Sequence, residues 1–425
     1  MKNPSPIQCG LAAPNRRMQK KNLIVALVEK IAARVASLPN MATVLVTGGT
    51  GFFGHNLVAA LLKDSRVAII RVYARNPPPT EATLSDYSED EPLMGWNTRE
   101  PCRKEDRVYR SAVPNEVFSH NRVHFHKGDI TDREALGKVM RDCHVVFHAC
   151  GDTRWWNAIE EQQFETNVTG TVNALELAIQ APTVTRFIYT STVDVMGTAG
   201  GYQMNEHQHG RPFDYHYAVT KSKADSFVLN HAEDPRQGMR ITIIRPGSML
   251  GPWDVTDQYG RLFKELKHRT MLGVPCGGTS VCHVEDVARA HIAAAFAPQL
   301  EHIVYVCAGK NMTYRQLFRV MRSQMESYQD SHATDADRLG MCCGPCEVIP
   351  RPVLVAYGWA CELYSNLISG KEPEVNPGMA RYLSEFAFYL STRAEEELGY
   401  PSQSPLRWEE ALADSYNWYR VRGRF

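Results

Sequence analysis

Residues 42–54 read ATVLVTGGTGFFG and decide the fold that the rest of the chain is expected to adopt. Val44, Leu45 and Val46 form a short apolar run, as in a parallel strand buried on both faces. Glycines follow at the spacing G-x-x-G-x-x-G, and a helical apolar stripe begins at Leu57. This layout lets backbone N–H groups approach a pyrophosphate at a helix N-terminus. It favours a dinucleotide site over a tight structural turn, which the glycine spacing alone fits equally well.

The glycines of this turn have separate predicted roles. A side chain at Gly48 or Gly51 would hold the phosphates away, and one at Gly54 would push the helix off the sheet. The turn as a whole is the predicted cofactor-binding segment, which adds Thr50, Phe52 and Phe53.

Composition bounds the class of protein. Of the 425 residues, 44% are hydrophobic and 22% charged, which is ordinary for a soluble globular protein. Lys plus Arg and Asp plus Glu number 47 each, so no net charge favours nucleic acid or an anionic membrane. Eleven scattered cysteines without a secretory segment indicate free thiols in a reducing, cytoplasmic compartment. No apolar run reaches the roughly 18 residues of a membrane span. The stretch that comes closest, 353–368, is interrupted by the charged Glu362 and is predicted as an amphipathic helix.

Residues 1–40 are predicted to be a basic appendage. Seven basic residues face the single acid Glu29, and an apolar helical stripe ends at Pro39. This acid-poor pattern fits a mitochondrial transit peptide. A solvated tail, or a working start at Met41, fits it equally well.

From residue 41 the sequence alternates strands and helices. Strands are predicted at 44–46, 67–73, 123–125, 145–148, 187–189 and 241–244, and helices at 164–179 and 217–231. The alternation predicts an α/β fold with a doubly wound parallel sheet, the Rossmann fold, over 41–250. The polar stretch 76–121 is predicted as a surface insertion. Residues 251–425 are predicted to form a smaller, mainly helical substrate-binding lid, with helices near 285–296, 313–326, 351–368 and 405–421.

The segment Tyr217-Ala-Val-Thr-Lys221 carries the sharpest chemical signal. Its i, i+4 spacing puts the phenol and the ammonium on one helix face. A neighbouring cation favours the phenolate, so the pKa of Tyr217 is expected below its usual value of about 10. Such a tyrosine can exchange a proton with a substrate oxygen while a nicotinamide exchanges a hydride. Thr190, Ser191 and Thr192, at the preceding strand end, either face the same crevice or form a Ser/Thr turn.

Together these features resemble the extended short-chain dehydrogenase/reductase family. The resemblance covers residues 42–423, and its motifs lie at 47–54, 128–130, 147–149, 189–192, 217–221, 245–247 and 283–287. It implies that Tyr217 is the catalytic acid/base, and that Lys221 lowers its pKa and holds the nicotinamide ribose. Thr192, with Ser191 as second candidate, would hydrogen-bond the substrate oxygen, and Asn167 would help to order the site's water.

The resemblance also implies further cofactor contacts and an assembly. Asp129 and Ile130 would flank the adenine, and the remaining contacts would come from Ala149, Pro246 and Gly247. In this family the helices that carry Asn167 and Tyr217 commonly form a homodimer interface. Within the family, the chain looks most similar to dihydroflavonol-reductase-like and 3β-hydroxysteroid-dehydrogenase-like enzymes, and to hopanoid-associated sugar epimerases.

Charge at the end of the second predicted strand indicates the nucleotide. NAD sites usually place an acid there, about 20 residues beyond the glycines, whereas this chain reads Tyr73-Ala74-Arg75. Arg75 could pair bidentately with a 2′-phosphate, which predicts NADP(H). Alternatively, Arg75 is a surface charge or stacks on the adenine, and NAD(H) binds.

The predicted substrate side of the crevice is rich in aromatic and sulfur-containing side chains. Its members are Arg154, Trp155 and Trp156 after the fourth strand, with Met196, Met249 and Trp253. If they line a pocket, the substrate is flat or alicyclic; the two adjacent tryptophans fit a core position equally well. A nucleotide-sugar would need basic residues for its diphosphate, which the run 261–269 could supply.

No metal site is predicted. The cysteine cluster at 342–346 lacks a nearby fourth ligand and the strand–helix context of a redox motif, so its thiols are interpreted as ordinary loop residues. By the resemblance, His283, Glu285 and Asp286 mark a helix start.

Three functions fit the sequence. The favoured one is an NADP(H)-dependent oxidoreductase that interconverts a ketone and a secondary alcohol on a hydrophobic ring substrate. The second is a nucleotide-sugar epimerase or dehydratase with a tightly held cofactor and the same Tyr217–Lys221 pair. The third is a catalytically silent nucleotide-binding protein.

Overall fold

The computed structural model describes residues 38–78, 114–234, 238–255, 259–268, 273–329, 347–402 and 405–421. The predictions for residues 1–37, for the 79–113 part of the insertion and for the cysteine cluster at 342–346 lie outside these residues.

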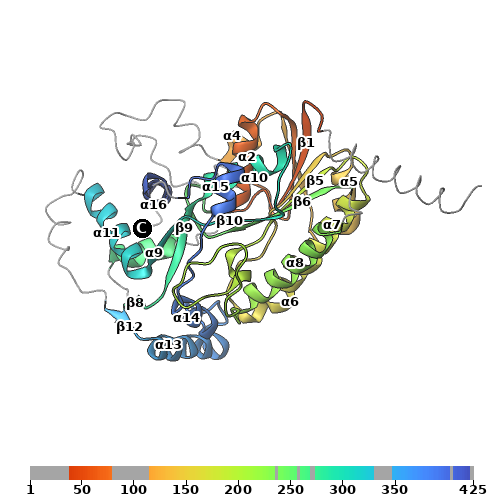
Figure 1. Ribbon diagram of the computed structural model, residues 1–425. Coiled ribbons are helices and arrows are strands. Elements are labelled where there is room, and N and C mark those ends of the chain that lie inside the picture. Colours follow the sequence, from red (N-terminus) through yellow and green to blue (C-terminus); the bar gives the residue numbers. More distant parts are fainter. Residues whose placement is uncertain are drawn as a thin grey trace, which may run out of the picture.

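A seven-stranded sheet forms the centre of the molecule (Figure 1). Its strands lie in the order β10-β6-β5-β4-β1-β2-β3, and every neighbouring pair is parallel. They are β1 Ala42–Thr47, β2 Val67–Ala74, β3 Val123–Lys127, β4 Val145–His148, β5 Arg186–Thr190, β6 Arg240–Pro246 and β10 Val304–Cys307. The prediction of a doubly wound parallel sheet is confirmed. The strand order reverses between β1 and β4, and such sheets bind ligands at that point.

Helices cover both faces of the sheet. One face carries α2 (Phe52–Lys63), α4 (Pro114–Phe118), α10 (Val284–Phe296) and α15 (Thr392–Leu398). The other carries α5 (Arg133–Met140), α7 (Gly170–Gln180) and α8 (His216–Ala232) (Figure 1). A separate hydrophobic core fills each layer. This explains why β1 and β4 read as continuous apolar runs, because both of their faces are buried.

The end of the predicted surface insertion is packed into the first of these cores. Within 76–121, residues 114–118 form α4, and Val117 is only 3% exposed. The ring of Phe118 meets that of His55 on α2 edge to face, with centroids 4.8 Å apart. This part of the stretch is therefore not a surface loop, because its two apolar residues are covered by α2.

The C-terminal region is helical, as predicted, and it also contains two small sheets. Its helices are α9 Gly260–His268, α11 Tyr314–Gln329, α13 Arg351–Tyr364, α14 Pro377–Leu383 and α16 Pro405–Val421. A three-stranded sheet joins β7 (Ser248–Leu250), β9 (Gly278–His283) and β11 (Lys310–Thr313), and β8 (Val274–Pro275) pairs with β12 (Val348–Ile349). The same region supplies β10 to the central sheet and α10 to its helical layer. None of the described helices is long and apolar enough to cross a membrane.

Candidate active site

The glycine turn lies between the end of β1 and the start of α2. Gly48 has a φ of +69°, and a Cβ there would lie 2.7 Å from the Cα of Cys150. The neighbouring loop after β4 therefore requires this glycine, in addition to any phosphate. A Cβ at Gly54 would overlap the backbone of Gly48 and Gly49, so the third glycine lets the helix pack on the turn. This agrees with its predicted role.

Gly51 leaves room for a ligand. A Cβ built there would meet only the Gly48 carbonyl oxygen, at 3.4 Å. Gly51 is the N-cap of α2 and has no side chain to cap the first N–H groups, which at a helix start have no intrahelical partners. Open space above a helix N-terminus fits a dinucleotide pyrophosphate. The side chains of Phe52 and Phe53 are buried in the core, so their contribution to this cradle is backbone.

A buried hydrogen-bond chain fixes the strand ends beneath the cradle. His148 Nδ1 lies 2.8 Å from Thr47 Oγ1, and its Nε2 lies 3.0 Å from Thr171 Oγ1. The Thr171 hydroxyl donates to the carbonyl oxygen of Asn167, so it accepts from His148, which must carry its proton on Nε2. Burial lowers the pKa of His148 to about 3, and the ring is therefore neutral at physiological pH.

Asn167 joins the loop after β4 to α8. It lies in the π-helix η3 (Glu165–Thr169), where its side-chain oxygen accepts from the Asp152 N–H at 2.7 Å. Its amide donates to the Asp152 carbonyl oxygen and to Thr220 Oγ1. Because its polar atoms are used by the protein, Asn167 holds the loop and the helix in register.

Tyr217 and Thr192 lie together, as the sequence predicts. Tyr217 is in the first turn of α8, and Thr192 caps the short helix η4 (Val193–Met196). Burial, and then the carboxylate of Asp194, raise the pKa of Tyr217 above its ordinary value. A hydrogen bond from the Thr192 side chain lowers this pKa but offsets only part of the rise. The expected fall in this pKa is therefore wrong.

Lys221 makes a different contact from the one expected. Its Nζ donates to the Thr190 carbonyl oxygen at 2.8 Å and lies 4.5 Å from the centre of the Tyr189 ring. Burial lowers the pKa of the Lys221 ammonium to about 8. Lys221 is not among the groups that shift the pKa of Tyr217, which are its burial, Asp194 and Thr192.

The structure distinguishes the two candidate hydroxyls. The Ser191 hydroxyl donates to the carboxylate of Asp225, which also forms a buried ion pair with Arg245, with Arg245 Nη2 2.6 Å from Asp225 Oδ2. Ser191 thus belongs to a buried network that links the end of β5 to α8 and β6. Thr192 is the hydroxyl directed at Tyr217.

A carboxylate that the sequence reading did not single out lies beside the tyrosine. Asp194 accepts a hydrogen bond from the Tyr215 hydroxyl and another from Tyr382. Burial raises the pKa of Asp194 to about 6. Its signal was a single acid within the otherwise apolar segment Val193-Asp-Val-Met196, directly after the Ser/Thr strand end.

The predicted substrate residues divide among three places. Trp155 and Met196 share one hydrophobic cluster with Tyr217, and Trp155 stacks on Tyr215 with centroids 4.1 Å apart. Trp253 is 2% exposed and packs in the α2 core near His55, with centroids 6.3 Å apart. Three others lie apart from the stack: Arg154 is paired with Asp152, Trp156 is half-buried beside it, and Met249 on β7 packs against the α2 core.

The remaining cofactor candidates lie at the strand ends. Arg75 Nη1 is 3.9 Å from Asp129 Oδ2, and both side chains are nearly half exposed. Ile130 is buried where a Cβ on Gly170 would touch it. Thr50 is half-buried in the glycine turn, Ala149 lines it, Pro246 ends β6, and Gly247 donates its N–H to Cys307 O at 3.1 Å.

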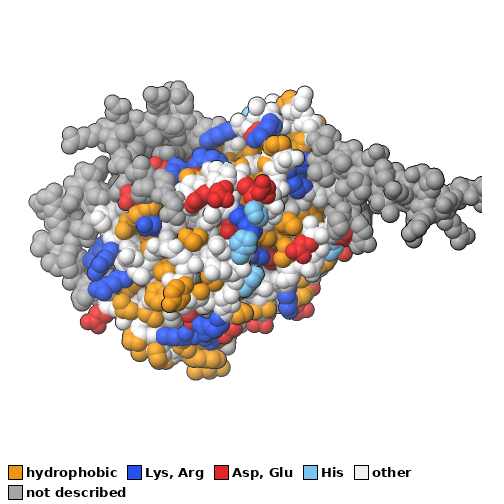
Figure 2. Space-filling model, viewed as in Figure 1, with side chains coloured by type: hydrophobic (Ala, Val, Ile, Leu, Met, Phe, Trp, Pro, Cys, Tyr) orange, Lys and Arg blue, Asp and Glu red, His pale blue; other side chains and the backbone are white. Residues whose placement is uncertain are grey.

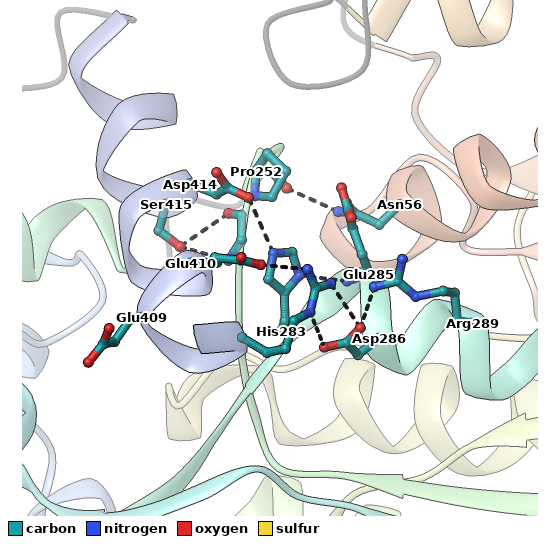
Figure 3. Close-up of polar contacts among 12 residues, drawn as sticks. Asn56, Pro252, His283, Glu285, Asp286, Arg289, Glu409, Glu410, Asp414 and Ser415 are labelled. Carbon is teal, nitrogen blue, oxygen red and sulfur yellow. Dashed lines mark hydrogen bonds and ion pairs between the residues drawn. The ribbon is translucent and has the colours of Figure 1, made fainter. Parts of the chain in front are cut away.

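His283 begins a helix, as predicted from the motif. Its Nδ1 accepts from the Glu285 N–H at 3.1 Å, which caps α10, and its Nε2 contacts Asp414 Oδ2 on α16 at 3.2 Å (Figure 3). Asp286 pairs with Arg289 and with Arg407, also on α16. These contacts tie the C-terminal helix to the central fold. In the described ranges, no group of His, Cys, Asp or Glu side chains is arranged to hold a metal.

Comparison with known proteins agrees with this geometry. Residues 44–308 match the NAD dependent epimerase/dehydratase family. A Synechocystis sp. protein provisionally named dihydroflavonol 4-reductase is 25% identical, over 89% of this chain and 94% of its own length. An Arabidopsis thaliana 3beta-hydroxysteroid-dehydrogenase/decarboxylase is 24% identical, over 85% of this chain and 76% of its own. MoeE5, solved with UDP-glucose and NAD, has the same fold, with a TM-score of 0.60 at 19% identity over 89% of this chain and 98% of its own.

Proposed function

The chain belongs to the NAD-dependent epimerase/dehydratase family, and from that membership we propose that it is an NADP(H)-dependent reductase/dehydrogenase of a hydrophobic ring ketone or alcohol. Membership makes it an enzyme of the NAD-dependent oxidoreductase type. The observation that carries the finer proposal is the contact between Tyr217 and Thr192 beside the aromatic stack of Trp155, Tyr215 and Tyr382. Flat apolar surfaces of this kind favour a ring system over a charged ligand.

The site residues have distinct tasks in this reaction. A nicotinamide, when bound, supplies or accepts the hydride. Tyr217, held neutral by its raised pKa, donates its proton to the carbonyl oxygen as the alcohol forms. Thr192 holds the same oxygen by a hydrogen bond. Lys221, whose ammonium titrates near pH 8, supplies positive charge beneath the strand end.

NADP(H) is proposed on the strength of Arg75. Its guanidinium is nearly half exposed at the end of β2, where it can reach a 2′-phosphate. Asp129 Oδ2 lies 3.9 Å from Arg75 Nη1, and NAD(H) would compete with NADP(H) by binding this carboxylate. Arg75→Asp should shift the NADP/NAD ratio of kcat/KM towards NAD, and an unchanged ratio would refute this assignment.

The decisive experiment is turnover of free NADPH with a panel of alicyclic and aromatic ketones. We expect net oxidation of NADPH, which Tyr217→Phe abolishes while cofactor affinity stays within a few-fold. Cofactor that is retained through purification, with interconversion of a nucleotide-sugar and no net redox change, would support the alternative. Silence in both assays with intact NADPH binding would favour a binding protein.

A nucleotide-sugar epimerase or dehydratase is the second candidate. Its support is the fold shared with MoeE5, which binds UDP-glucose and NAD. It would need basic side chains for the diphosphate. Among the basic residues of the run 261–269, the structure describes the side chain of Lys264 on α9, which is exposed. The aromatic stack beside Tyr217 offers no charge to a diphosphate, which is why the ketone substrate is preferred.

We also propose a homodimer in a reducing, cytoplasmic compartment, with targeting by residues 1–40 as the alternative location. The six cysteines in the described part of the chain are free thiols, as expected there. The helices that carry Asn167 and Tyr217 lie on one outer face of the sheet (Figure 1). Light scattering at micromolar concentration should give twice the chain mass of 47.9 kDa.

A further inference from the structure

Thr192 and Tyr217 come from two different elements, and a buried carboxylate joins those elements. Thr192 is the N-cap of η4, and Tyr217 is in the first turn of α8. The carboxylate belongs to Asp194, which is itself on η4. In the reaction proposed above, both hydroxyl groups must reach one substrate oxygen, so η4 and α8 must keep a fixed separation.

Asp194 forms hydrogen bonds on both sides of this junction. On the side of η4, its backbone N–H donates to Thr192 Oγ1 at 3.2 Å. On the side of α8, its carboxylate accepts from the hydroxyl of Tyr215. Tyr215 is the N-cap residue of α8, and its side chain makes no cap hydrogen bond to that helix. The Tyr215 hydroxyl therefore anchors the start of α8 to η4.

A third element reaches the same carboxylate. Tyr382 on α14 also hydrogen-bonds Asp194, and its ring meets that of Tyr215 edge to face, with centroids 5.4 Å apart. The ring of Tyr215 stacks against Trp155 and against Tyr217, with centroids 4.1 Å and 6.2 Å apart. Asp194 therefore holds the polar end of a ring that packs against the catalytic tyrosine.

Within the residues that the structure describes, no cation is among the groups that shift the pKa of Asp194. Burial raises this pKa, and hydrogen bonds from Tyr215, Thr192 and Tyr382 lower it. The other titratable groups whose pKa responds to this carboxylate are the phenols of Tyr217, Tyr259, Tyr314 and Tyr389. Figure 2 shows basic side chains on the surface where Figure 1 places α14. Arginines on and around α14 pair with surface acids: Arg381 with Asp214, and Arg211 and Arg351 with Glu385.

We propose that Asp194 is a positioning residue of the reaction, and that its ionised carboxylate holds the start of α8 so that the Tyr217 hydroxyl stays beside Thr192. The role rests on the reaction proposed above. Asp194 acts through Tyr215, without touching the reacting atoms. An ionised carboxylate accepts hydrogen bonds on both oxygens, and these are stronger than neutral ones. The protonated carboxyl therefore holds the two tyrosine hydroxyls less tightly.

The positioning role predicts that activity and stability respond to pH in opposite directions. The pKa of Asp194 is raised to about 6, so the carboxyl is mostly protonated at pH 5 and mostly ionised at pH 7. Ionisation strengthens the hold on α8, so kcat should rise about five-fold from pH 5 to pH 7. The same ionisation lowers the stability of the folded state. A carboxyl that served stability alone would not give a rising kcat.

NMR of the full chain with carbon-13-labelled tyrosine tests the linkage without turnover. Tyr217→Phe assigns the Cζ signal of Tyr217. In the wild type this signal should move between pH 5 and pH 7 with a midpoint near 6, and a signal that stays still would overturn the proposal. Asp194→Asn cannot ionise and should abolish the movement.

Tyr215→Phe separates position from charge. It keeps the carboxylate and the stacked ring but removes the hydrogen bond that anchors α8. The movement of the Tyr217 signal should therefore shrink at least two-fold. A movement of full size in this variant would mean that the charge of Asp194 acts on Tyr217 directly, and it would overturn the positioning role.

Kinetics with NADPH and a ketone measures the consequence for the reaction. At pH 7, Asp194→Asn should lower kcat about ten-fold, less than the roughly 10²-fold that a 1 Å misplacement can cost. The KM for the ketone should stay within two-fold, because the stacked rings remain. At pH 5 the variant and the wild type should differ by less than about two-fold. An equal ratio at both pH values would overturn the proposal.

Tyr389→Phe is the matched control. It also removes a buried tyrosine hydroxyl, which donates to the carbonyl oxygen of Gly197 at the end of η4 and not to Asp194. It should keep kcat within two-fold and retain the full movement of the Tyr217 signal. If that signal moves as expected in a chain that does not oxidise NADPH, the linkage stands and the proposed reaction fails, so the two proposals fail separately.

Discussion

Two neighbouring hydroxyl groups have different tasks: one contacts the catalytic tyrosine and the other supports the structure of the site. Thr192 hydrogen-bonds Tyr217, whereas Ser191 donates to the buried Asp225. Thr192→Ala should lower kcat/KM by about 10²-fold, the usual effect of removing one donor from a developing oxyanion, and should cost about 1 kcal/mol of stability because Thr192 also caps η4. Ser191→Ala should cost about 1–3 kcal/mol of stability, because Asp225 loses a donor, and it should spare kcat. Equal kinetic losses in both variants would contradict the assignment.

The buried carboxylate of Asp194 predicts a pH dependence of stability. Its folded pKa is about 6, above the ordinary 3.8, so the folded state holds the proton more tightly than the unfolded state. This carboxyl therefore stabilises the fold most below pH 4, and that contribution is lost as pH rises through 6. The unfolding free energy of the wild type minus that of Asp194→Asn should fall by roughly 2–3 kcal/mol from pH 4 to pH 7, at about 1.4 kcal/mol per pKa unit. Parallel urea-denaturation results for the two proteins at both pH values would contradict this.

At the scale of helices and strands, the local sequence pattern predicted those elements that local interactions determine. The strand β4 was predicted without error, because an apolar run is enough to specify it, and α8 was predicted within one residue at each end. The strand β10 was missed, since its four residues pair with β6, about sixty positions earlier. The core position of Trp253 and the pairing of Lys221 with a carbonyl oxygen also depend on distant neighbours. Periodicity carries no information about such partners.

The glycine turn gives a prediction at the same scale. Gly48→Ala places a Cβ against the Cys150 backbone at a φ of +69°, so it should cost more than about 1–2 kcal/mol of stability. Gly51→Ala meets only one atom, at 3.4 Å, so the fold should tolerate it. It should still weaken NADPH binding at least ten-fold, because the methyl group occupies the space above the helix N-terminus. Thermal melting with and without NADPH measures both effects. An unchanged NADPH affinity in Gly51→Ala would show that no phosphate binds at this position.

The whole molecule packs as one unit, because the part after residue 250 contributes a strand and a helix to the sheet and helical layer built by the part before it. The sequence suggested a boundary at residue 250, yet β10 pairs with β6 and α10 packs on α2 across it. The residues of α10 that pack inward are almost all apolar: Val284, Val287, Ala288, Ala290, Ile292, Ala294 and Ala295. Arg407 pairs with Asp286 and thereby fastens α16 to the start of the same helix. Asp414 on α16 also contacts His283 there (Figure 3).

This interlocking predicts a single unfolding transition for the full chain. The calorimetric and van't Hoff enthalpies should agree, since neither half has a complete core by itself. A fragment of residues 38–250 would expose the face of α2 that α10 covers and the edge of β6 that β10 covers, so it should bind a hydrophobic dye and melt without a cooperative transition. Arg407→Met leaves Asp286 with one partner, Arg289, and should lower the one melting temperature of the full chain without splitting it. Two resolved transitions, or a cooperatively folded 38–250 fragment, would mean that the sheet is complete without β10.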